Sequence, residues 1–105
     1  MVIYEVNLKI NKEIFTKYKT WLDGHIQQML RIPGFLQATL LQEILDDEYQ
    51  TPAQKNITVQ YLLRNSADLK TYFDKYASSM RDDGINRFKN NFSATRRIFE
   101  VEKMF

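Results

Sequence analysis

The chain has 105 residues, of which 44% are hydrophobic and 13% aromatic, and its 15 Lys and Arg against 13 Asp and Glu give a formal charge of +2. This length fits one domain with one core, and the near balance of charge is unlike the basic excess of a typical DNA-binding domain. The absence of cysteine together with a single histidine excludes disulfides, thiolate zinc sites and thiol nucleophiles, and leaves no histidine-rich metal site.

The first third of the chain predicts a strand followed by a helix. Residues 2–10 alternate between an apolar and a more polar set, which is typical of a half-buried strand. Asn11 stands at the position of a helix N-cap. Apolar residues over 14–30 recur at spacings of three and four, which predicts an amphipathic helix of about four turns. Pro33 and Gly34 predict the end of this helix.

The middle of the chain predicts a hairpin. Residues 35–45 are rich in apolar side chains and predict a second strand, and the alternation over 57–63 predicts a third. The polar segment 46–56 between them contains Pro52 and predicts an exposed connecting loop.

The last third predicts a second helix and a final strand. Ser66 stands at the N-cap position of the helix, whose apolar stripe extends from Leu69 to Met80. Asp82 and Asp83 favour a further helix start through the helix dipole, so we expect a short extra turn or two before a strand over about 94–104.

These elements follow one another in the order β-α-β-β-α-β. That order predicts an α+β protein of the ferredoxin-like type, in which both helices cover one face of an antiparallel sheet. No repeat, linker or low-complexity segment interrupts the chain. We therefore expect residues 1–105 to form a single domain.

Alternation along the strands assigns the two sheet faces to different environments. One set is almost wholly apolar and should lie beneath the helices: Val2, Tyr4, Val6, Leu8, Ile57, Val59, Tyr61 and Leu63. The opposite set is mixed in polarity: Ile3, Glu5, Asn7, Thr58, Gln60 and Leu62. A face of this mixed kind is typical of a sheet that packs on another sheet. We expect a homodimer in which the two sheets meet face to face.

His25 is the candidate for catalysis. It follows Trp21 by four residues on the predicted helix, so both side chains project from one helix face toward the sheet. A histidine with a pKa near neutral can act as a general base or bind a ligand carboxylate. The alternative is a half-buried structural histidine at the boundary between helix and sheet. The sequence alone places no Asp or Glu where it would orient the imidazole.

Three tyrosines and a basic segment are two further candidates for a ligand site, and both patterns are less specific. Tyr18, Tyr72 and Tyr76 lie on the helix stripes, where aromatic residues more often pack in the core than rim a ligand pocket. The region 81–97 either holds an anionic ligand or forms a solvated face. Its basic residues are Arg81, Arg87, Lys89, Arg96 and Arg97.

Neither nucleic acid nor a membrane is expected as a partner. RNA-recognition motifs share this order of elements, but exposing Tyr4 to stack a base would bury Glu5 unpaired beneath the helices, at a cost of several kcal/mol. No apolar run approaches the roughly 18 residues of a transmembrane helix. Glu5 also falls where the apolar region of a signal peptide begins. We expect a cytoplasmic protein.

Short segments spread over nearly the whole chain carry a resemblance to a known family. They are 3–6, 21–26 leading into 33–36, 58–61, and 81–96. On these segments the chain resembles a bacterial family of about this length that is classed as a domain of unknown function, within the superfamily of dimeric α+β barrels. The resemblance implies a homodimer whose two sheets form a closed barrel, and it brings no established activity.

The wider superfamily contains antibiotic-biosynthesis-type and haem-degrading monooxygenases, lactone isomerases, EthD-like proteins and subunits without catalysis. Trp21 and His25 match a pattern of the EthD-like branch, an aromatic residue a few positions before a histidine on the first helix. The haem-degrading enzymes match poorly: Asn7 corresponds to an asparagine that they use, but Tyr72 and Tyr76 occupy the region of their haem-ligating histidine. We therefore expect no haem oxidation and no cofactor; a tyrosine ligand to haem is the alternative that the sequence leaves open.

The sequence leaves three functions open. The first is binding of a small planar or acidic molecule in a cleft between sheet and helices, lined by Tyr4, Trp21, His25 and Tyr61. The second is a cofactor-free monooxygenase or isomerase that uses His25 as its base. The third is a non-catalytic interaction module in which His25 is structural.

Overall fold

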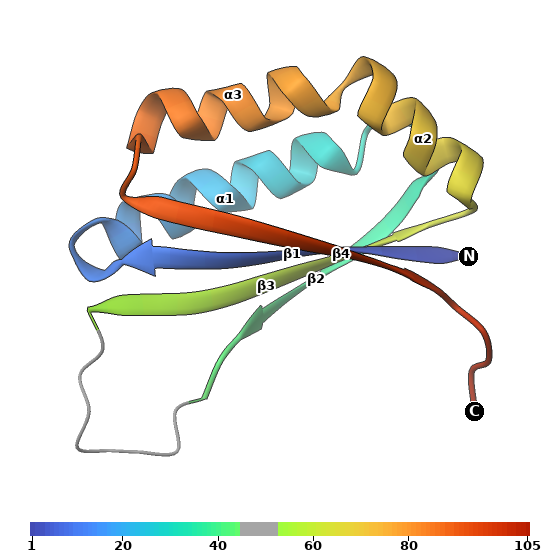
Figure 1. Cartoon of the computed structure of the whole chain (residues 1–105), viewed down its shortest axis with the longest axis horizontal. Helices are drawn as coiled ribbons and strands as arrows, with labels where there is room; N and C mark the ends of the chain where they lie inside the picture. The colour runs from blue at the N-terminus through green and yellow to red at the C-terminus, as the bar shows by residue number, and fades with distance from the viewer. Residues whose placement is uncertain (45–52) are drawn as a thin grey trace.

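The computed structural model of the chain describes residues 1–44 and 53–105. Its elements in chain order are β1 (Val2–Asn11), the short 3-10 helix η1 (Lys12–Ile14), α1 (Phe15–Met29), β2 (Phe35–Gln42), β3 (Gln54–Leu63), α2 (Ser66–Lys75), α3 (Ala77–Phe88) and β4 (Phe92–Glu100). The helices lie on one face of the sheet and leave the other face open (Figure 1). This arrangement confirms the predicted α+β, ferredoxin-like fold.

The four strands form an antiparallel sheet in the order β2-β3-β1-β4, so β1 is a central strand. Tyr4 on β1 lies opposite Tyr61 of β3 and Ile98 of β4, while the next residue, Glu5, lies opposite Gln60 and Arg97. Because neighbouring residues of a strand point to opposite faces, this register directs Tyr4 toward the helices and Glu5 toward the open face.

The core lies between the helices and the predicted apolar face of the sheet. Tyr4 is 1% exposed, Tyr61 2% and Leu63 0%. Most of the remaining predicted helix-facing residues are also buried, and Val6 is half-buried at the edge of the core. From the helices, Tyr18, Leu22, Leu69 and Tyr72 complete this layer. The assignment of sheet faces from sequence alternation is therefore confirmed.

Two predicted helix caps are wrong in detail. The Asn11 side chain caps no helix; it donates to Asn91 Oδ1 at 3.2 Å and accepts from Gln54 Nε2 at 3.1 Å, and so joins three element ends. The second helix is capped by Asn65 rather than Ser66, because the Asn65 Oδ1 accepts from the backbone N–H of Asp68 at 2.9 Å.

The second helical region is broken at Tyr76, although the sequence predicts one continuous stripe from Leu69 to Met80. The Tyr76 backbone leaves helical geometry for one residue (φ −122°, ψ −31°), and α2 and α3 differ in direction there (Figure 1). The expectation that Asp82 and Asp83 begin a short helix is wrong. Both lie inside α3, which already begins at Ala77.

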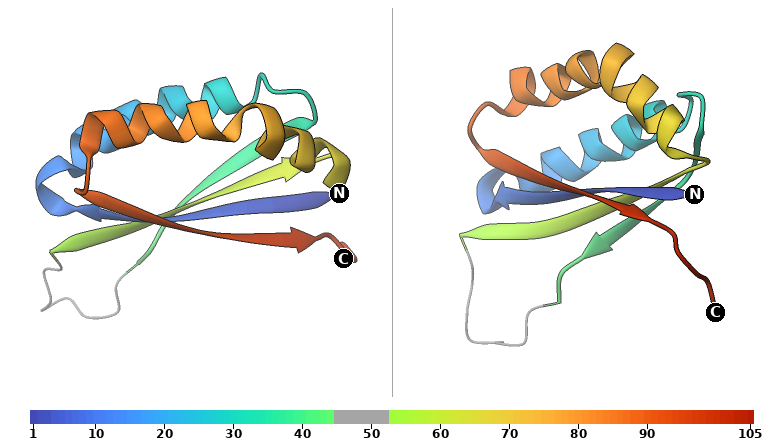
Figure 2. Two further views of the ribbon diagram at one scale, coloured as in Figure 1. Left: turned by 45° about the horizontal axis from the view of Figure 1, so that its top comes forward. Right: turned by 45° about the vertical axis from the view of Figure 1, so that its right-hand side comes forward.

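Several strand boundaries also differ from the prediction. β2 ends at Gln42, and residues 45–52, which include most of the predicted loop, lie outside the described residues. β3 begins at Gln54, so residues 54–56 are strand rather than loop. β4 ends at Glu100; the backbone N–H of Val101 still donates to the Met1 carbonyl at 2.8 Å, and the chain then turns away from the helices (Figure 2).

The turn from α1 into β2 depends on Gly34. Its φ of +93° lies in the left-handed region that favours glycine. Its carbonyl accepts from the backbone N–H of Arg64 at 3.0 Å, and a Cβ at this position would overlap the Asp68 side chain. Gly34 therefore allows the start of β2 to approach the start of α2.

We expect Gly34→Ala to lower the free energy of unfolding by about 2–4 kcal/mol, from the strained φ and the overlap with Asp68 together. Gly24→Ala is the matched control. A Cβ on Gly24 meets nothing within 4 Å, so alanine should raise stability by about 1 kcal/mol through its higher helix propensity. Urea denaturation of both variants measures the difference. Equal effects would contradict the role given to Gly34.

Candidate functional site

A cavity of about 60 Å³ lies between the sheet and the helix layer. Its walls combine apolar side chains with eight that carry polar groups: Tyr4, Tyr18, Trp21, His25, Tyr61, Tyr72, Arg81 and Arg96. All four residues predicted to line a ligand cleft, Tyr4, Trp21, His25 and Tyr61, thus lie on one cavity. It is smaller than typical ligand pockets of roughly 300–1,000 Å³.

Trp21 and His25 form one unit in the cavity wall. They lie one turn apart on α1, and their rings stack with centroids 4.7 Å apart and an interplanar angle of 23°. The Trp21 Nε1–H donates to Asp83 Oδ2 of α3 at 2.8 Å, and Asp83 Oδ1 accepts from Arg87 Nε at 3.1 Å. Asp83 therefore fixes the indole against which the imidazole stacks.

Gly84 lets α3 approach this pair closely. A Cβ on Gly84 would lie 2.8 Å from Cη2 of Trp21, closer than carbon atoms pack. Because the indole donates a hydrogen bond to Asp83 and also stacks on His25, it has little freedom to move away. Because residue 84 has no side chain, the Trp21 indole can pack between α1 and α3.

The surroundings of His25 favour the neutral imidazole. Burial lowers its pKa below the ordinary value of 6.5, and the nearby Asp83 carboxylate opposes this effect only in part. At neutral pH the ring therefore has a free nitrogen lone pair that can accept a proton or a hydrogen bond. Among the described residues, no hydrogen bond ties this ring to another side chain or to the backbone.

Asp83 is held as a carboxylate. Its pKa lies below the ordinary value because the Trp21 indole N–H and the Arg87 guanidinium both donate to it. No sequence pattern marked Asp83 as a neighbour of His25, because the two residues lie on different helices. Only the pairing of α1 with α3 brings them together.

The opposite wall of the cavity is built around Tyr4. Its ring packs against Tyr61, Tyr72 and Phe73, with centroids 5.4–6.1 Å apart. Its hydroxyl accepts from an Arg81 guanidinium nitrogen at 3.2 Å. Burial raises the pKa of Tyr61 and Tyr72 above the ordinary value of 10, so these phenols remain protonated and act as hydrogen-bonding groups rather than charges.

The structure divides the basic segment that the sequence presents as one group. Arg81 and Arg96 line the cavity. Arg87 and Arg97 instead pair with carboxylates, Asp83 and Glu5 respectively. Lys89 ends α3 with a φ of +54°. Of the five basic residues, only Arg81 and Arg96 therefore lie at the cavity. That this segment holds an anionic ligand stays a prediction.

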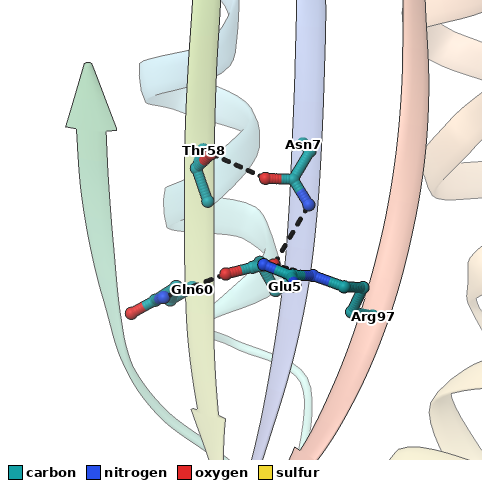
Figure 3. Close-up of polar contacts among 5 residues, drawn as sticks. All are labelled: Glu5, Asn7, Thr58, Gln60 and Arg97. Carbon is teal, nitrogen blue, oxygen red and sulfur yellow. Dashed lines mark hydrogen bonds and ion pairs between the residues drawn. The ribbon is translucent and has the colours of Figure 1, made fainter. Parts of the chain in front are cut away.

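A second polar cluster lies on the open face of the sheet (Figure 3). Glu5 is only 4% exposed and accepts from Gln60 Nε2 at 3.0 Å, Asn7 Nδ2 at 3.1 Å and Arg97 Nε at 2.7 Å. Thr58 donates in turn to Asn7 Oδ1 at 2.8 Å. The hydrogen bonds from Gln60 and Asn7, together with the Arg97 ion pair, lower the pKa of Glu5. We refer to these five residues as the Glu5 network.

Solved structures with the same fold come from several protein classes. A protein of Deinococcus radiodurans named as a candidate antibiotic biosynthesis monooxygenase is 16% identical, with a TM-score of 0.72 over 100% of this chain and 96% of that one. SnoaB of Streptomyces nogalater, a cofactor-independent oxygenase, is 11% identical, with a TM-score of 0.67 over 98% and 97%. An EthD (ethyl tert-butyl ether D) family protein of Bacillus halodurans is 13% identical, with a TM-score of 0.64 over 99% and 100%.

These similarities define the class as α+β proteins with the fold of the antibiotic biosynthesis monooxygenases and EthD proteins, in agreement with the resemblance found in the sequence. At these identities they establish the fold alone. The chain belongs to the family DUF4286, a domain of unknown function, whose model matches residues 1–102. A search of curated proteins finds no match.

The part of the chain that the structure describes holds neither a grouped set of metal ligands nor a helix that could span a membrane. No three His, Cys, Asp or Glu side chains there are grouped so as to hold a metal ion. No helix there is long and apolar enough to span a membrane. The expectation that no haem is bound stays a prediction.

We expect NMR titration of the single histidine to give a pKa below 6.5, and Asp83→Asn to lower it further by removing the opposing carboxylate. Because the unfolded chain then binds a proton at a higher pH than the folded chain does, the contribution of His25 to stability is complete above 6.5 and is lost as the pH falls toward the folded pKa. Urea denaturation between about pH 7.5 and 5.5 measures that loss, which His25→Gln should abolish. A His25 pKa at or above 6.5 would refute this account.

Proposed function

We propose that the chain is a ligand-binding protein whose site is the cavity between the sheet and the helices, and that it works as a cytoplasmic homodimer. The ligand is a small planar or acidic molecule. The observation that carries the proposal is the convergence of Tyr4, Trp21, His25 and Tyr61, from three separate elements, on one cavity. Aromatic walls with a few polar groups are typical of small-molecule sites.

The position of His25 supports this function over a purely structural one. A structural histidine is expected to be sealed from solvent and hydrogen-bonded to the backbone. His25 is half-buried, lines the cavity, and stacks on an indole that Asp83 already orients. These features support the proposal that the imidazole contacts a bound molecule.

A cofactor-free enzyme is the second candidate, as an oxygenase or isomerase of an aromatic-like substrate. The lowered pKa of His25 favours it, since a neutral imidazole at the cavity wall can take a proton from a substrate carbon or hydroxyl. The likeness to SnoaB concerns the fold alone. The third candidate, a non-catalytic interaction module, requires no occupant of the cavity, and the ligand experiment below separates it from the other two.

The open face of the sheet supports the homodimer. The directly opposed residues Ile3, Leu62 and Phe99 form an apolar row on it, next to the row that contains Glu5. Phe99 is 39% exposed in one chain. Exposed apolar area beside satisfied polar groups is typical of the surfaces on which protein partners meet. A second copy of the sheet would cover this row.

A thermal-shift screen of small planar and acidic molecules, aromatic acids included, tests the ligand site. A ligand at about ten times its dissociation constant should raise the melting temperature by roughly 5 °C. We expect His25→Ala to abolish this shift while leaving the protein folded, and Gln28→Ala, an exposed position on α1, to leave it unchanged. Failure of every compound would favour the interaction module, and unfolding of His25→Ala would favour a structural histidine.

Light scattering at micromolar concentration tests the dimer. We expect twice the 12.6 kDa mass of one chain. Phe99→Asp should give monomers, because it places a charge in the apolar row. Ile98→Asp is the control: it changes a neighbouring residue that is 55% exposed and lies on the other face of the sheet. A monomeric wild type, or equal behaviour of the two variants, would rule out pairing through this face.

A further inference from the structure

Two guanidinium groups face the cavity from opposite layers. Arg81 comes from the helix layer on α3, and Arg96 from the edge strand β4. Arg81 is half-buried, and one of its terminal nitrogens donates to the Tyr4 hydroxyl at 3.2 Å. Its Nε is fully buried and has no hydrogen-bond partner among the described residues. A buried donor without a partner costs free energy, and natural structures rarely keep one unless a ligand or water completes it.

The charge of these two arginines is not balanced inside the cavity. Among residues 1–44 and 53–105, no aspartate or glutamate lines it. Four ion pairs are found in the described part of the chain, at Arg64, Lys70, Arg87 and Arg97, and none includes Arg81 or Arg96. Both arginines therefore lie beside the cavity with their charge available to an anion. Guanidinium groups bind carboxylates and phosphates through paired N–H donors.

The apolar part of the cavity wall favours an organic anion over an inorganic one. Val6, Leu8, Leu22 and Met29 line the same cavity and offer contact to a hydrocarbon skeleton rather than to further charge. The volume of about 60 Å³ is small for a ligand pocket and favours a ligand with few atoms. A carboxylic acid of three or four carbons matches this small volume and the division of the walls into a charged and an apolar part.

We infer that the cavity binds the carboxylate of a small organic acid between Arg81 and Arg96, with its carbon skeleton against the apolar wall. This inference rests on the proposed ligand-binding function and names the chemical class of the ligand. Tyr4 orients Arg81 through its hydroxyl. The position of His25 on the same cavity places the imidazole near the skeleton of the acid.

Butanoate and its neutral analogue butanamide form a matched pair of probes, and the fluorescence of Trp21, the single tryptophan of the chain, reports occupancy. We expect saturable binding of butanoate, and binding of butanamide and of inorganic phosphate that is at least about tenfold weaker. Arg96→Gln and Arg81→Gln should each weaken butanoate binding about tenfold. Arg64→Gln, which changes an exposed arginine paired with Asp68, should bind as wild type does.

Three outcomes would overturn the inference. Equal affinity for butanoate and butanamide would show that binding does not depend on the carboxylate charge. Phosphate binding as tight as that of butanoate would show that binding does not depend on the carbon skeleton. Wild-type affinity in Arg96→Gln would show that the carboxylate is not bound between Arg81 and Arg96. The Arg96 side chain is exposed at the cavity edge, so this variant tests the inference even where Arg81→Gln does not fold. Binding of neutral planar molecules alone would leave the proposed function standing, whereas failure of all ligands would end both.

Discussion

The packing of Tyr4 joins the sheet to the α2–α3 layer, and both the core and the cavity depend on it. The side chain comes from the central strand, is 1% exposed, and contacts aromatic rings of β3 and α2. Its ring thus contributes burial in the middle of the core. Its hydroxyl also accepts from Arg81 of α3. One side chain therefore contacts both layers and supplies a hydroxyl group to the cavity between them.

The strict alternation of β1 explains why the sheet presents two different kinds of surface. Tyr4 faces the helices, and Glu5, the next residue, faces away from them. The Glu5 carboxylate is almost fully covered, but four donor groups from its neighbours compensate the loss of water. A carboxylate that accepts several hydrogen bonds can be covered by a second layer of protein at a small cost in desolvation free energy. An isolated buried charge could not be covered in this way.

The sequence predicted those features that depend on local periodicity. The order of strands and helices, the two sheet faces and the cavity residues of β1, α1 and β3 follow from spacings of two, three and four. The caps depend on single backbone angles, and Asn65 and Ser66 are equally good cap residues by type. The break at Tyr76 was invisible because Tyr72, Tyr76 and Met80 keep helical spacing across it. The contacts of Asp83 and Arg81 join elements far apart in the chain, and local patterns carry no information about such pairs.

The adjacent arginines Arg96 and Arg97 of β4 affect how well the pairing register of this edge strand with β1 is specified. Arg97 pairs with Glu5 on one face, and Arg96 lies at the cavity on the other. A shift of β4 by one residue would bring Arg96 opposite Glu5 and direct Arg97 toward the helices, so the pattern of charges would hardly change. Electrostatics therefore discriminates poorly between the two alignments. The choice falls to Phe92 and Ala94, which the shift would move out of the core.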